Sequence, residues 1–237
     1  MVPNGFEQIL IIQTVVKNKK HSLFFALMKK KNEISYDKVF SLIKEKESNI
    51  KVSWIIVDFE LALVNSCIKN FKNARVRRCW FHFDQILFRK VSDLGCKKIF
   101  KESPSFRTHC FLISALAFVP PEKTLEEFDN LLFYFEHLQN INEKIFIFAE
   151  WFKSNYISNG VGKNHSTVFW STYDLALANL PFTNNSLEAY NRHLNNFSET
   201  THPSLYSLLS ELKKETELSF IEIEIATFKE IRQYGSN

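Results

Sequence analysis

The sequence predicts an α/β fold with a large all-helical insertion, and three observations support this. A continuous apolar run, Trp54–Val57, leads into Asp58 and a segment with helical periodicity, which is typical of a strand buried on both faces. Two β-rich segments separated by a short polar stretch precede this run. From Phe81 to about Tyr156, by contrast, nearly every segment has the periodicity of a helix.

The first predicted elements are the two strands of a hairpin, residues 6–16 and 21–28. Basic side chains lie at the turn between them. They are Lys17, Lys19 and Lys20. A second basic group, Lys29-Lys30-Lys31, closes the second strand. Lysines at such a place either protect a sheet edge against aggregation or contact DNA, and the sequence leaves both interpretations open.

A helix is expected over residues 35–46, where apolar side chains recur at helical spacing and Ser35 is the expected N-cap. The Asp58 strand and its helix follow, and then a short strand over residues 74–79. The order hairpin, helix, strand, helix, strand matches a ribonuclease-H-like sheet that lacks its first strand.

Beyond this sheet the sequence predicts mainly helices. Segments 106–118, 124–138, 141–152 and 172–179 carry apolar stripes, and further helices are expected over 183–195 and from residue 203 onward. Residues 220–225 alternate apolar and acidic side chains, but we predict a helix because the flanking residues are helix formers. The resulting division is a first core part (1–84), a helical insertion (85–180) and closing core helices (181–237).

The composition and the charge distribution limit the functions that this chain can have. The 237 residues are 45% hydrophobic, which is enough for a sizeable core. Residues 1–101 carry 20 Lys/Arg against 9 Asp/Glu, a net charge of +11, whereas residues 102–237 carry 10 against 17, a net charge of −7. A basic half of this kind suits a surface that binds a polyanion, although lysines that only interact with solvent would give the same count.

Other features exclude several classes of protein. Four cysteines do not form a secreted disulfide framework, so a reducing compartment is expected. Only 5 glycines are present, which argues against a glycine-rich phosphate loop. No secretory signal peptide is found, and the apolar segment 9–16 is too short to cross a bilayer. We expect neither a membrane anchor nor a small-molecule cofactor.

Four sequence blocks occur in an order that resembles Mutator-like element (MULE) transposases. The first is the run that ends at Asp58, and the second is Cys79-Trp80-Phe81-His82. The third and fourth cover residues 115–121, which end at two prolines, and residues 180–188, which end at Glu188. The blocks span nearly the whole chain.

This resemblance implies metal-dependent DNA cleavage and strand transfer in the nucleus, at the ends of a transposable element. Three carboxylates would hold two Mg²⁺ ions, or Mn²⁺ in their place. The second acid of the family corresponds to Asp58 and the third to Glu188. The first acid would lie on a strand ahead of residue 2, so we expect the chain to be truncated and catalytically inactive on its own.

Each of these residues also has a structural interpretation. Asn185-Ser186-Leu187-Glu188 has the spacing of a capping box, so Glu188 could satisfy the backbone at a helix start, and Asp58 could be a cap or an ion-paired residue. Cys79 and His82 have CxxH spacing, half of a zinc site, and candidate partners are His109, Cys110 and His202. The alternative is a buried cysteine beside a satisfied histidine.

Arginines Arg75, Arg77 and Arg78 accompany the second strand of the parallel pair, and with the hairpin lysines they form the predicted DNA-binding set. The function that we predict is therefore that of a transposase domain whose partner is DNA. A domesticated, non-catalytic module that binds DNA or another protein is the alternative. The sequence leaves open whether the chain forms a homo-oligomer.

Overall fold

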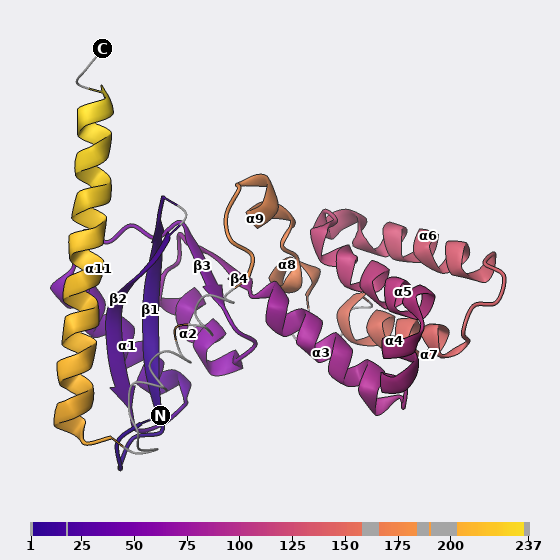
Figure 1. Ribbon diagram of the computed structural model, residues 1–237, viewed down its shortest axis with the longest axis horizontal. Helices are drawn as coiled ribbons and strands as arrows, with labels where there is room; N and C mark the ends of the chain where they lie inside the picture. The colour runs from indigo at the N-terminus through magenta and orange to yellow at the C-terminus, as the bar shows by residue number, and fades with distance from the viewer. Residues whose placement is uncertain (1, 18, 158–165, 184–189, 191–202, 235–237) are drawn as a thin grey trace. The chain divides into compact units, whose positions relative to one another are not determined.

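The computed structural model describes residues 2–17, 19–157, 166–183, 190 and 203–234 (Figure 1). The chain forms two compact units, the first from residues 1–49 and 186–237 and the second from residues 50–185. Helices and strands occur in both, which confirms the mixed α/β class. The three segments expected from the sequence divide the chain at other positions, after residues 84 and 180.

The hairpin of the first unit forms as predicted. Strands β1 (Gln8–Val16) and β2 (Lys19–Met28) pair antiparallel, from Gln8 opposite Met28 to Val16 opposite Lys19. Lys17 at the turn has a φ of 49°, a left-handed conformation that is uncommon for a residue other than glycine.

Helix α1 (Glu33–Lys46) begins two residues earlier than the sequence predicted. Its N-cap is Asn32 rather than Ser35, because Asn32 has extended backbone angles and its side-chain oxygen accepts a hydrogen bond from the Ser35 backbone N–H at 2.9 Å. The prediction of Ser35 as the cap was wrong, since the helix begins earlier and Ser35 itself donates one of the first-turn N–H groups that the Asn32 side chain satisfies.

Helix α11 (Leu205–Tyr234) covers the hairpin with an apolar stripe. Leu208 and Leu212 are buried on side chains of both strands, and α11 lies along β2 (Figure 1). The helix runs without interruption through residues 220–225, which confirms that the alternating pattern there is helical. Of the helix expected over 183–195, only residues 183 and 190 lie within the described part of the chain.

The second unit opens with a β-α-β element. Strands β3 (Trp54–Val57) and β4 (Arg75–Arg78) pair in parallel, with Trp54 opposite Arg75 and Val57 opposite Arg78, and α2 (Leu61–Asn70) connects them. Among the described residues β1–β2 and β3–β4 are two separate two-stranded sheets. The continuous ribonuclease-H-like sheet expected from the sequence is therefore not observed within them.

The remaining described residues of the second unit form mainly helices, as predicted. The helix expected over 106–118 ends in a 3-10 turn, Leu116–Phe118, before the two prolines that cannot continue it. The helices are α3 (Trp80–Asp93), α4 (Lys97–Glu102), α5 (Pro104–Ala115), α6 (Thr124–Glu136), α7 (Lys144–Phe152) with a π-helical extension Lys153–Ile157, α8 (Thr167–Trp170) and α9 (Tyr173–Leu177).

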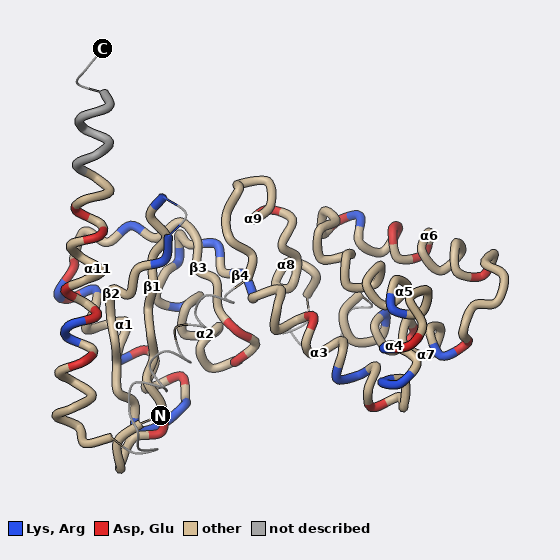
Figure 2. The backbone as a smooth tube through the Cα atoms, in the orientation of Figure 1, with Lys and Arg blue, Asp and Glu red and all other residues tan. Residues whose placement is uncertain are grey.

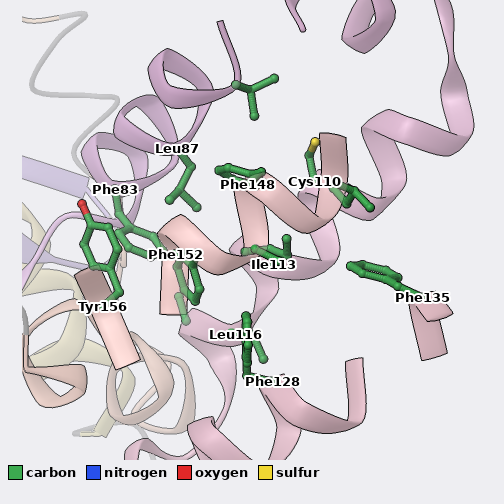
Figure 3. Close-up of a cluster of buried hydrophobic side chains, with 14 of the residues drawn as sticks. Phe83, Leu87, Cys110, Ile113, Leu116, Phe128, Phe135, Phe148, Phe152 and Tyr156 are labelled. Atoms are coloured by element: carbon green, nitrogen blue, oxygen red, sulfur yellow. The ribbon is translucent and has the colours of Figure 1, made fainter. Parts of the chain in front are cut away.

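Aromatic side chains fill the core of this unit. Phe83, on α3, is fully buried, and its ring stacks on Trp170 with 4.9 Å between the ring centroids and 10° between the planes. The rings of Phe152 and Tyr156 lie against Phe83 nearly edge-on (Figure 3). Stacked and edge-to-face aromatic pairs stabilise a core beyond the contribution of the area that they bury. The Phe83 ring therefore packs α3 against α8 and the carboxyl end of α7 with its extension.

Candidate active site

The site is built around Asp58, which directly follows β3. Its Oδ1 accepts a hydrogen bond at 3.0 Å from the backbone N–H of Glu60, one residue before α2 starts. Asp58 thus satisfies a backbone N–H group in the turn from strand to helix. This is the structural role, as a capping residue, that the sequence left open. The side chain is only half-buried, so the strand end presents a carboxylate that solvent can reach.

Arg78 lies at the end of the neighbouring strand, opposite Val57, and it interacts electrostatically with Asp58. It is 3% exposed, and its guanidinium lies over the ring of Phe59 at 4.7 Å and near that of Phe169 at 5.9 Å. Burial lowers the pKa of Arg78, while electrostatic interactions with Tyr156 and Asp58 act in the opposite direction. A cation held among aromatic rings therefore interacts electrostatically with the acid that we predicted as a metal ligand.

Arg77 has a different partner. Its Nη2 lies 2.7 Å from Oδ2 of Asp174, at the start of α9, and its side chain is largely buried. Arg75 is 4.0 Å from the same carboxylate oxygen and is mostly exposed. Both guanidiniums also lie over the ring of Trp54. The sequence offers no signal for Asp174, which lies 97 residues away from Arg77.

The three arginines predicted to bind DNA are therefore not equivalent. Only Arg75 presents most of its side chain to solvent, whereas Arg77 and Arg78 are buried. Breaking a buried ion pair leaves an uncompensated charge, so Arg77 is tied to the packing of α9. That all three arginines contact DNA is still a prediction. Arg75 is the most accessible of the three to a DNA partner.

The hairpin lysines lie in the first unit. Lys17 donates a hydrogen bond from its Nζ to the carbonyl of Ala226 on α11, and Lys19 is exposed. Lys20 is half-buried beside them. Lys17, one of the three hairpin lysines predicted to contact DNA, thus anchors the hairpin turn to α11.

Cys79 and His82 lie at the start of α3. Cys79 is fully buried, and its backbone N–H donates to the carbonyl of Val57 at 2.7 Å. Of the candidate zinc partners, His109 and Cys110 are buried in α5 and His202 lies outside the described residues. Within the part of the chain that the structure describes, no group of three or more His, Cys, Asp or Glu side chains could hold a metal.

Glu188, the other predicted metal ligand, also lies outside the described residues. The neighbourhood of Asp58 offers one carboxylate, already bonded to the backbone, and a buried guanidinium. Mg²⁺ prefers several oxygen ligands in octahedral geometry, so the described residues do not fit this ion by themselves.

Residues 5–85 match the family model of the MULE transposase domain. The matched stretch runs from the start of the hairpin to the first turns of α3, and it contains Asp58, the three arginines and the CxxH pair. Searches of the curated proteins and of the solved structures found no match. In the described ranges no helix is long and apolar enough to cross a membrane.

Proposed function

We propose that this chain, whose residues 5–85 match the MULE transposase domain, is a transposase domain that binds DNA in the nucleus and supplies part of the site for cleavage and strand transfer. The observation that carries this proposal is the position of Asp58. An acid at the carboxyl end of a parallel strand, at a strand-to-helix junction, is where open α/β folds place their sites. The order of the elements along the chain also supports a ribonuclease-H-like fold.

In this proposal Asp58 and Glu188 are joint ligands of Mg²⁺ or Mn²⁺, ions that supply charge stabilisation during displacement at phosphorus. The backbone N–H of Glu60 would hold the Asp58 side chain at the end of the strand, and the buried guanidinium of Arg78 favours its ionised form. The partly exposed carboxylate is then available to a cation that approaches from solvent.

Metal binding by the full chain tests this assignment, with Mn²⁺ as the probe and titration calorimetry as the measurement. We expect Asp58→Asn and Glu188→Gln each to weaken Mn²⁺ binding by about tenfold or more, since each removes a charged ligand. Asp93→Asn is the matched control, because Asp93 is an exposed acid at the end of α3. Equal Mn²⁺ affinity of Asp58→Asn and the control would contradict the assignment.

We further propose that the carboxylates of Asp58 and Glu188 do not by themselves suffice for cleavage. Two Mg²⁺ ions carry four positive charges, and two carboxylates supply only two negative ones. We therefore expect the full chain to leave a DNA duplex intact in the presence of Mg²⁺ or Mn²⁺, as measured by nicking of a supercoiled plasmid. Metal-dependent nicking that disappears in Asp58→Asn would show that another acid of this chain completes the site.

The second candidate function is a non-catalytic module that binds DNA or a protein. The electrostatic interaction between Asp58 and Arg78 favours it, because a carboxylate whose charge is offset by that of a buried guanidinium serves the fold without a metal. The two candidate functions predict different results in the calorimetric measurement of Mn²⁺ binding described above. A non-catalytic module predicts that Mn²⁺ affinity is the same with and without the Asp58 carboxylate.

A further inference from the structure

We propose that the outer surface of α4, with two cations that flank it, docks the phosphate backbone of a DNA duplex. This inference rests on the proposed function, and it assigns DNA contacts to a part of the chain outside the residues that match the transposase model. We call this surface the basic ridge, and it comprises Lys97, Lys98, Lys101, Arg107 and Lys144.

The sequence of α4 gives this short helix two different faces. Ile99 and Phe100 are partly buried and pack against the main core. The lysines follow at i, i+1 and i+4, an arc of about 100° on a helix, and all three are exposed. The packing of the apolar face thus turns the lysines together toward solvent.

Two contacts add the flanking cations to this surface. A guanidinium N–H of Arg107 donates to the carbonyl of Lys101 at 3.3 Å, which places it at the end of α4. The Nζ of Lys144 donates to the carbonyl of Leu94 at 3.3 Å, in the turn between α3 and α4. Lys144 also lines, together with Lys98, a hollow of about 450 Å³.

The cations of the ridge are available to a partner. Within the described part of the chain, none of the five lies within ion-pairing distance of a carboxylate. One acid, Glu102, lines the same hollow as Lys98 and Lys144, so the local charge is reduced but stays positive. The hydroxyl of Ser103 and the amide of Asn142 border this hollow as well.

The distribution of charge over the helices favours an extended anion. Residues 89–107 contain six basic and two acidic side chains, a net charge of +4, whereas residues 122–136 contain one basic and five acidic ones, a net charge of −4. Figure 2 shows the blue of Lys and Arg around α4 and the red of Asp and Glu along α6. A helical region with opposite charges on different helices orients a polyanion toward its basic helices.

A DNA duplex fits this surface better than a small anion does. The ridge carries its cations along the outside of one helix and over its two ends, and a row of separate cations matches a backbone with regularly spaced phosphates. Each phosphate contact made by Lys or Arg releases counterions, so such a contact can be recognised by its salt dependence.

The experiment measures duplex binding by the full chain, using fluorescence anisotropy of a labelled 30-base-pair duplex over a series of NaCl concentrations. The test variant is Lys97→Gln/Lys98→Gln/Lys101→Gln. The control, Lys46→Gln/Lys51→Gln/Lys72→Gln, removes three exposed lysines elsewhere and changes the net charge equally. A third variant replaces the three ridge lysines by arginine, and circular dichroism checks that all variants are folded.

We expect the ridge variant to bind at least about tenfold more weakly near 100 mM salt. The slope of log K against log salt should become shallower by about 2 to 3, because each lost phosphate contact contributes about 0.9. The control should stay within about twofold of the unchanged chain, and the arginine variant should bind like the unchanged chain.

The outcomes separate this inference from the function on which it rests. If the unchanged chain binds no duplex, the proposed function fails and the inference fails with it. If the unchanged chain binds and the ridge variant matches the control, the inference alone is overturned, and the ridge serves another partner, such as an acidic protein.

Discussion

Phe83→Ala is expected to lower the free energy of unfolding of this protein by about 3–5 kcal/mol. The Phe83 ring is fully buried, and it contacts four other rings, those of Phe59, Phe152, Tyr156 and Trp170. Truncation to alanine removes the transfer free energy of the ring and leaves a cavity that these rigid neighbours cannot fill.

Urea unfolding followed by tryptophan fluorescence measures this loss, and two variants serve as controls. Phe83→Leu keeps most of the buried volume and should cost clearly less than Phe83→Ala. Phe133→Ala removes an equal number of atoms from a ring that is 65% exposed, and it should change the stability by no more than about 0.5 kcal/mol. Equal effects of Phe83→Ala and Phe133→Ala would contradict the central role of the Phe83 ring.

The second large effect concerns the thiols of Cys67 and Cys110, which should react at least about a thousandfold more slowly than an exposed cysteine at pH 8. Burial raises the pKa of each thiol from 9.0 to about 12, and the neighbouring Cys96 also raises the pKa of Cys110. Only the thiolate attacks a disulfide reagent, and three pKa units reduce the thiolate fraction about a thousandfold.

Rates of labelling by a disulfide reagent, with the labelled cysteine identified by mass spectrometry, measure this protection, and unfolding in urea should abolish it. The raised pKa values of the two thiols also make the stability of the fold depend on pH. Because the folded pKa lies above the unfolded one, these thiols favour the fold below pH 9, and this contribution is lost as the pH rises from about 9 to about 12. Fast labelling of both cysteines in the native protein at pH 8 would contradict the burial described above.

The sequence by itself determined the local elements and the place of Asp58 in them. The hairpin, the two short strands, most helices and the helical nature of residues 220–225 follow from apolar periodicity, because each strand or helix must turn one face toward a core. Asp58 at the end of a strand follows from the same pattern. The likeness to MULE transposases, carried by ordered sequence blocks, is confirmed for residues 5–85.

Only the tertiary structure decided which charges are buried and what they contact. In the sequence Arg75, Arg77 and Arg78 form one basic cluster, yet Arg77 pairs with Asp174 and Arg78 lies among aromatic rings beside Asp58. The periodicity of apolar residues indicates which positions are buried. It carries no information about the partner of Arg77, which lies 97 residues away in the sequence. The partner is selected when distant helices pack, because a buried charge must then find an opposite charge or a ring face nearby.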